Sequence, residues 1–153
     1  MDELWLRQYP ASVPAQVRTD GPASLVAMLE RSFRAHRALP ACLCMGRSLS
    51  FGQIDDLSQA LAAHLQSLGL ARGDRVALML PNVPQMLVAA AAVLRAGLVV
   101  VNVDPLLGPQ GLAHQLRDSG ARVIVIMETA AATLAEVESF LKAPRAWQDA
   151  RKA

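Results

Sequence analysis

Few residues of this chain have the types and spacing that catalysis or metal binding requires. The three histidines, His36, His64 and His114, are far from one another and from the cysteines, so no spacing typical of a zinc site emerges. The paired acids Asp55-Asp56 fall at the start of a predicted helix, where they favour the helix dipole without any catalytic role. Asp104 ends a predicted strand, a common ligand position, but an aspartate before a proline also forms turns.

The two cysteines, Cys42 and Cys44, are two residues apart on a predicted strand. This spacing directs both side chains to one face and argues against a disulfide between them. A metal or redox pair would need further ligands, and no such ligand pattern is found in the sequence. We therefore interpret both as ordinary reduced core thiols.

Motifs that bind nucleotides or activate nucleophiles are missing from the sequence. It contains no Gly-x-x-x-x-Gly-Lys loop, no Gly-x-Gly-x-x-Gly after a strand and no Gly-x-Ser-x-Gly elbow. The only lysines are Lys142 and Lys152, so residues 1–141 offer no ammonium group. A net charge of +2 does not favour nucleic-acid binding. A flavodoxin-like nucleotide binder is a weak alternative because the glycine loops are absent.

The residues 74–105 are predicted to form a strand, helix and strand around which the rest of the chain is organised. Both strands, Val76–Leu80 and Leu98–Val101, are uninterrupted apolar runs, typical of a parallel sheet covered on both faces. The alanine-rich helix between them is expected to have Asn82 as its N-cap and to end at Gly97. Loops at the ends of such strands commonly hold ligands.

The remaining pattern predicts further helices and strands on either side of this unit. Ser24 is expected to cap a helix over Leu25–Phe33, and Gly46-Arg47 to form the turn of a β-hairpin. Ser50 and Gln53 form a capping box for a helix whose apolar stripe comprises Ile54, Leu57, Leu61, Leu65 and Leu68, with Asp55 off that face. A helix from Gly108-Pro109, a strand over Arg122–Met127 and a helix capped by Thr129 follow.

The alternation of strands and helices predicts the α/β class: a partial doubly wound, mostly parallel sheet with flanking helices and an N-terminal β-hairpin. Residues 1–22 are expected to be an extended arm, 23–141 an incomplete α/β subdomain and 142–153 a charged, disordered tail. The longest apolar run, Met86–Leu94, is too short to span a membrane, and the N-terminus lacks a secretory signal pattern. These features favour the cytoplasm.

Several short motifs, in this order and spacing, resemble the N-terminal region of AMP-forming acyl-CoA synthetases, and of bacterial long-chain fatty-acid–CoA ligases in particular. The resemblance covers roughly residues 1–141. It rests on Trp5-Leu6, Tyr9-Pro10, Leu49-Ser50-Phe51, Gly73-Asp74-Arg75-Val76-Ala77, Leu80-Pro81-Asn82, Leu94-Arg95-Ala96-Gly97, the segment 100–106 and the segment 114–121.

The resemblance implies that the parent enzyme activates a fatty acid with ATP and Mg²⁺ to an acyl-adenylate and transfers the acyl group to coenzyme A. The family's phosphate loop, adenine motif, ribose-binding aspartate and catalytic lysine lie beyond residue 153, so no catalytic, cofactor or metal residue is predicted here and none of these cofactors is expected for this chain alone. Asn82, Asn102 and Asp104 are expected to border a substrate pocket completed elsewhere.

The chain departs from the family pattern after its second parallel strand. Where the family commonly has Asn-Pro-x-Tyr-Thr-x-x-Glu-Leu, this sequence has Asp104 to Leu112, with Gly108 and Gly111 in place of the threonine and glutamate. These glycines remove a capping box, at a cost of about 1 kcal/mol.

Two hypotheses follow. The first is an N-terminal segment of a long-chain fatty-acid–CoA ligase that is inactive alone. The second is a catalytically silent interaction module that pairs with itself or with a full-length synthetase through an exposed apolar face. Neither involves a transmembrane segment, although the parent family is compatible with peripheral membrane contact.

Overall fold

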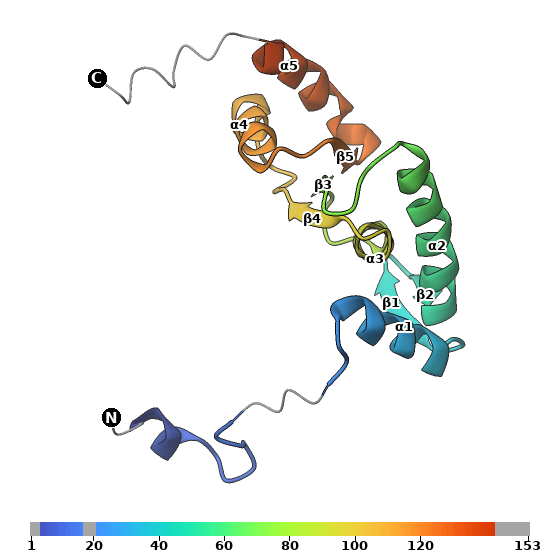
Figure 1. Cartoon of the computed structure of the whole chain (residues 1–153), viewed down its shortest axis with the longest axis vertical. Coiled ribbons are helices and arrows are strands. Elements are labelled where there is room, and N and C mark those ends of the chain that lie inside the picture. Colours follow the sequence, from blue (N-terminus) through green and yellow to red (C-terminus); the bar gives the residue numbers. More distant parts are fainter. Residues whose placement is uncertain (1–3, 17–20, 143–153) are drawn as a thin grey trace.

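The structure of the chain is a computed structural model that describes residues 4–16 and 21–142 (Figure 1). Its elements, in order, are a 3-10 helix (Leu4–Gln8), α1 (Leu25–Ala35), β1 (Pro40–Cys44), β2 (Arg47–Ser50), α2 (Phe51–Ser67), β3 (Arg75–Met79), α3 (Pro84–Arg95), β4 (Val99–Asn102), α4 (Pro109–Ser119), β5 (Val123–Ile126), a 3-10 turn (Glu128–Ala130) and α5 (Ala131–Lys142). Within this described part, no helix is both long and apolar enough to cross a bilayer.

The central sheet has three parallel strands in the order β4-β3-β5. Ala77 of β3 pairs with Val101 on one side and with Ile124 on the other. The predicted α/β class and parallel pairing are confirmed. Each strand differs from its predicted bounds by about one residue, because hydrogen-bonded pairing and not apolar character sets the bounds. Leu80, for example, lies beyond the end of β3 but is still buried.

Helices cover both faces of this sheet. The first face of β3, with Val76 and Leu78, packs in one core with residues of α2 and α3 such as Leu65 and Val93. The opposite face, which includes Ala77 and Met79, packs against α4 and α5. Figure 1 shows α4 and α5 on one side of the strands and α2 and α3 on the other. Because both faces of the central strand β3 are buried, this strand needs no polar alternation, as predicted, whereas the edge strands β4 and β5 are only partly buried.

The α1 helix and the β-hairpin form a further layer outside α2 and α3. Phe33 of α1, Ile54 of α2 and Ala91 of α3 are buried together, with Leu49 and Phe51 packed beside them. Small side chains on α3 leave room for this layer: Ala89 and Ala92 face the sheet core, while Ala91 faces the α1 side. The alanine-rich helix therefore packs on two sides at once.

The hairpin turn lies one residue earlier than predicted. Cys44 pairs with Arg47, so Met45-Gly46, and not Gly46-Arg47, forms the two-residue turn. Both turn residues have positive φ angles, +49° at Met45 and +75° at Gly46, as the favoured type I′ turn requires. Glycine at the second position adopts this conformation without cost, whereas Met45 adopts it with strain.

We expect Met45→Asn to stabilise the chain by about 0.5–1 kcal/mol, because asparagine tolerates the left-handed conformation far better than methionine. The Met45 side chain is 99% exposed, so its removal sacrifices no packing. Urea unfolding measures the change. Met45→Ala, which keeps a Cβ without a local polar partner, serves as the control, and an equal gain in both variants would contradict the turn argument.

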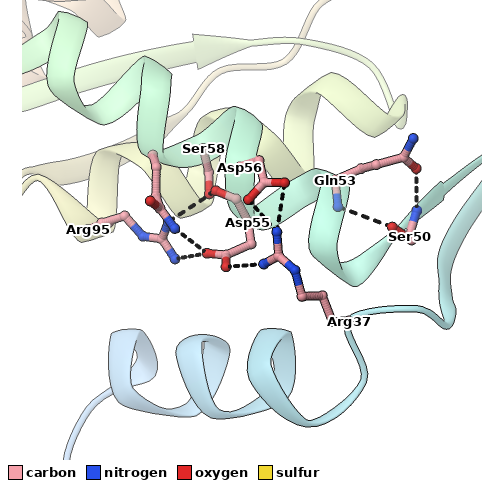
Figure 2. Close-up of polar contacts among 8 residues, drawn as sticks. Arg37, Ser50, Gln53, Asp55, Asp56, Ser58 and Arg95 are labelled. Carbon is pink, nitrogen blue, oxygen red and sulfur yellow. Dashed lines mark hydrogen bonds and ion pairs between the residues drawn. The ribbon is translucent and has the colours of Figure 1, made fainter.

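The helix starts follow the predicted caps in two of four cases. Ser24 Oγ accepts a hydrogen bond from Ala27 N at 3.1 Å. Ser50 Oγ accepts from Gln53 N at 3.1 Å, while Gln53 Oε1 accepts from Ser50 N at 2.9 Å (Figure 2), which confirms the capping box. The α4 helix begins after Gly108 with no side-chain cap, as its sequence departure implies.

Two cap predictions are wrong. The N-cap of α3 is Val83, without a side-chain hydrogen bond, and not Asn82. Pro84 at the first helical position explains the shift, because a proline forces the residue before it into an extended conformation. The last helix begins at Ala131, since Thr129 lies inside the preceding 3-10 turn.

The predicted terminal segments are described only in part. The arm predicted over residues 1–22 contains the short 3-10 helix, with Trp5 and Tyr9 exposed. Of the tail predicted over residues 142–153, the residues after Lys142 lie outside the described part of the chain. The domain boundaries therefore stay predictions.

Candidate functional site

The carboxyl edge of the parallel sheet is the place where this architecture positions ligand-binding residues. The chain leaves β3 toward α3 on one face and leaves β4 toward α4 on the other face. The loops after these neighbouring strands thus diverge. In open α/β sheets, ligands commonly bind at such a switch point. Asn82 follows β3, and Asn102 and Asp104 lie at the end of β4, so the three predicted residues are at this edge of the sheet.

Asn82 is exposed in the loop after β3. It borders a cavity of about 200 Å³ between β1 and the start of α3, whose lining is Cys42, Leu43, Cys44, Asn82, Val83, Pro84, Met86 and Leu87. Its amide is therefore available to a ligand rather than committed to capping α3. Its role as a pocket border stays a prediction.

Asn102 and Asp104 lie at the end of β4 and are both exposed, but they do not line that cavity. Asp104 Oδ1 accepts a hydrogen bond from Leu106 N at 2.9 Å, and its carbonyl oxygen accepts from Leu107 N at 3.1 Å. The backbone oxygen of Asn102 accepts from Gln115 Nε2 at 2.8 Å. These contacts order the turn that leads to α4. Asp104 therefore has the turn-forming role that an aspartate before a proline commonly has.

The most highly organised polar cluster lies elsewhere, where α2 meets α3 (Figure 2). Asp55 Oδ1 accepts hydrogen bonds from Arg95 Nη2 at 2.8 Å and Gln59 Nε2 at 3.0 Å, and its Oδ2 accepts from Arg37 Nη1 at 3.1 Å. Arg37 Nη2 also pairs with both carboxylate oxygens of Asp56, at 2.7 and 2.8 Å. The cluster joins α2, α3 and the segment after α1.

Arg95 is held from two further directions. Its Nη1 donates to the backbone oxygen of Asp55 at 3.2 Å, and its guanidinium carbon lies 5.5 Å from the centre of the Phe33 ring. The side chain is only 14% exposed and that of Asp55 only 11%. A charge-assisted pair so shielded from water is expected to be much stronger than one on the surface.

The placement of Asp55 contradicts the prediction from sequence. The buried face of α2 carries Ile54, Asp55, Ser58, Ala62 and Leu65, whereas Leu57 and Leu68 are about half exposed. The predicted apolar stripe is therefore wrong at Leu57 and Leu68. The α2 helix packs closely against the alanine-rich α3, and small residues suit such close packing. Ser58 and Ala62, four residues apart, are the small residues that mark the buried face of α2, and Ala62 packs with Ala89 and Ala92 of α3.

The same geometry keeps Asp55 ionised. Burial alone would raise the pKa of its carboxyl group, but hydrogen bonds from Gln59 and Arg95 and the positive charges of Arg95 and Arg37 outweigh burial and lower the pKa. A carboxylate saturated with donors and held below its usual pKa does not exchange protons near neutral pH. The cluster is therefore structural, and it borders an open cleft of about 260 Å³ that Glu30 and Arg34 also line.

This lowered pKa predicts how stability depends on pH. A depressed folded-state pKa contributes stability above the unfolded pKa of about 4, and that contribution is lost as pH falls through the folded-state value. We expect the advantage of the wild type over Asp55→Asn in urea unfolding to be full above about pH 5 and to shrink steadily below about pH 4. Asp118→Asn, which removes a carboxylate at an exposed position of α4, is the control variant.

The described residues do not fit the groups that an AMP-forming ligase handles. Among them, no group of three or more histidines, cysteines, aspartates or glutamates is arranged to hold a metal ion. The acid at the sheet edge, Asp104, is used by its own turn, and no glycine-rich phosphate loop follows β3.

The sheet, its divergent loops and its flanking helices define the class of protein. The model of the AMP-binding enzyme family matches residues 29–151, most of the chain. The chain belongs to the AMP-binding enzyme family.

Within that family, the chain is similar to bacterial long-chain fatty-acid–CoA ligases. It is 49% identical over 138 residues to the ligase of Escherichia coli O6:H1 and 48% identical over 138 residues to that of Yersinia pestis. Each match covers 90% of this chain and 25% of the relative. The chain thus spans about a quarter of the length of these relatives.

Solved structures agree on the fold. A benzoate CoA ligase from Burkholderia xenovorans LB400 superposes with a TM-score of 0.71 at 23% identity, over 74% of this chain and 23% of that one. A fatty acyl CoA synthetase from Mycobacterium tuberculosis gives 0.69 at 25% identity over the same shares. The N-terminal domain of FACL13 from the same organism gives 0.70 at 25% identity, covering 74% of this chain and 29% of that domain. The predicted fold, an N-terminal subdomain of acyl-CoA synthetases, is confirmed.

Proposed function

We propose that this chain is the N-terminal segment of a long-chain fatty-acid–CoA ligase and acts as a scaffold for a reaction whose catalytic groups are elsewhere. That reaction is the ATP-dependent activation of a fatty acid to an acyl-adenylate, followed by transfer to coenzyme A. The observation that carries the proposal is the identity of 48–49% to such ligases over 90% of the chain.

The proposed contribution of the scaffold is to place one edge of the substrate pocket. The connections after β3 and β4 leave toward opposite faces of the sheet. Asn82, Asn102 and Asp104 lie in these connections, at the carboxyl edge of the sheet. Asn82 offers an exposed amide, and the turn at Asp104 fixes the backbone after β4. The proposed role of these residues is to position substrate, with no proton transfer.

A hybrid enzyme tests the proposal. The matching N-terminal quarter of the Escherichia coli relative is replaced by the residues of this chain, and fatty-acid-dependent release of pyrophosphate from ATP is measured. We expect the hybrid to be active and the isolated 153-residue chain, assayed in parallel, to be inactive.

Controls separate folding from function. The hybrid with Asn82→Ala should lose activity at unchanged thermal stability, whereas the hybrid with Leu106→Ala, changed at an exposed site, should match the parent hybrid. A folded but inactive parent hybrid would contradict the scaffold proposal. Pyrophosphate release by the isolated chain that depends on both ATP and fatty acid would contradict its lack of catalytic groups.

A second candidate function is a catalytically silent module that pairs with another copy or with a full-length synthetase. The observation that favours it is the exposure of large apolar side chains on the hairpin, where Leu43 is 75% and Met45 is 99% exposed. Light scattering during gel filtration discriminates the two, because a monomer at all concentrations would count against pairing with itself.

A further inference from the structure

A side chain of α4 reaches back to the carboxyl edge of the sheet. Gln115 Nε2 donates a hydrogen bond of 2.8 Å to the backbone oxygen of Asn102, the last residue of β4 and thirteen residues earlier in the chain. Gln115 is partly buried, whereas Asn102 is exposed. The scaffold role places Asn102 and Asp104 at one edge of the substrate pocket but leaves Gln115 without a function.

The backbone oxygen of Asn102 needs this donor because the described sheet does not supply one. Val103, the next residue, donates its backbone N–H to Leu78 of β3 at 3.0 Å. Successive residues of a strand direct their backbone groups to opposite sides, so those of Asn102 point away from β3. Among the described strands, β4 is an outer strand with no partner on that side. The side chain of Gln115 therefore satisfies a carbonyl group that a strand edge would leave unpaired.

The same bond connects a loop to a helix that the core holds in place. Leu112 of α4 is completely buried against the sheet, which fixes the position of the helix. The turn after β4 is closed by Asp104, whose contacts are internal to the turn and do not reach α4. The bond from Gln115 to Asn102 thus sets the point at which this turn leaves the sheet.

We propose that Gln115 is a positioning residue for the substrate pocket of the parent reaction. It holds the backbone that carries Asn102 and Asp104, and it acts through these residues without touching substrate. This inference rests on the proposed function, because the pocket belongs to that reaction. Loss of a residue that only positions the pocket edge raises KM and leaves the chemical step unchanged.

Hydrogen exchange of the 153-residue chain tests the anchor without an assay of activity. Gln115→Met keeps the length of the side chain but removes its N–H donor. We expect the backbone amides of Val103 and Leu107 to exchange about 2- to 10-fold faster in this variant, which corresponds to the loss of one net hydrogen bond. Gln115→Lys, which offers N–H donors at a similar reach, should restore most of the protection.

Gln110→Met is the matched control, because Gln110 lies on the same helix but is exposed. Its exchange rates should equal those of the wild type. Unchanged exchange at Val103 and Leu107 in Gln115→Met, or the same increase in the control, would overturn the inference. An equal increase throughout β3 would also overturn it, because that result would mean a general loss of stability.

The hybrid enzyme described above tests the consequence for the reaction. In the hybrid, Gln115→Met should raise the KM for ATP, for the fatty acid or for both by about 2- to 10-fold, with kcat within about 2-fold of the parent hybrid. Unchanged KM values, or a loss of kcat alone, would overturn the pocket role of Gln115. An inactive parent hybrid would instead contradict the proposed function, while exchange in the isolated chain would still decide whether Gln115 anchors the turn.

Discussion

Replacing Arg95 by alanine is expected to lower the free energy of unfolding by about 3–5 kcal/mol, the cost of removing one partner of a buried ion pair. The change strips Asp55 of its closest cationic partner at 2.8 Å and of the donor to its backbone oxygen. It also removes the cation that lies over Phe33. Arg37 remains, but its side chain is 54% exposed and offsets little of the loss.

Urea unfolding measures this effect, and Arg34→Ala is the matched control. Arg34 lines the same cleft from α1 but is exposed, so its removal should change stability by less than about 0.5 kcal/mol. A double-mutant cycle isolates the pair, since Arg95→Ala should cost much less when Asp55 is already alanine. Equal costs in both backgrounds would mean that the two residues do not interact.

Replacing Leu112 by alanine should cost about 2–5 kcal/mol through lost burial and the cavity left behind. Leu112 is completely buried in the core between the sheet and α4, where Met79 and Val137 also pack. The start of α4 adds no stabilisation that could offset this loss, because Gly108 has no side chain to cap the helix. Thermal and urea unfolding should agree in direction.

Leu106→Ala is the matched control for that substitution. Leu106 is 89% exposed in the turn before α4, only six residues away, so the same chemical change there should be nearly neutral. A comparable loss at both positions would contradict the burial described for this face of the sheet.

The fold was predictable because its signals are local and redundant. The uninterrupted apolar strands indicated a sheet covered on both faces, and β3 is indeed buried on both. The capping box at Ser50 and Gln53 depends on neighbours three residues apart and was therefore correctly predicted. The strand order β4-β3-β5 is a nonlocal property, which the alternation of elements constrains but does not specify.

One wrong prediction depends on a contact between distant segments, and another on a local effect of proline. The sequence pattern places Asp55 off the buried face because its main cationic partner, Arg95, lies forty residues away. Burial of the acid depends on that contact together with the donors Gln59 and Arg37. Asn82 has a side chain typical of an N-cap, but Pro84 holds Val83 in the extended conformation and thereby moves the cap position to Val83. At the sheet edge, pattern and resemblance placed three residues in one region, but whether they border a pocket stays a prediction.

The strand order also bears on how the chain is built during synthesis. The central strand β3 precedes both of its neighbours in the sequence, so each later strand meets an edge that is already present. β4 follows β3 through one helix, and β5 adds to the opposite edge about twenty residues later. A nascent chain can therefore assemble the sheet in the order in which the ribosome releases it, with no strand inserted between two others.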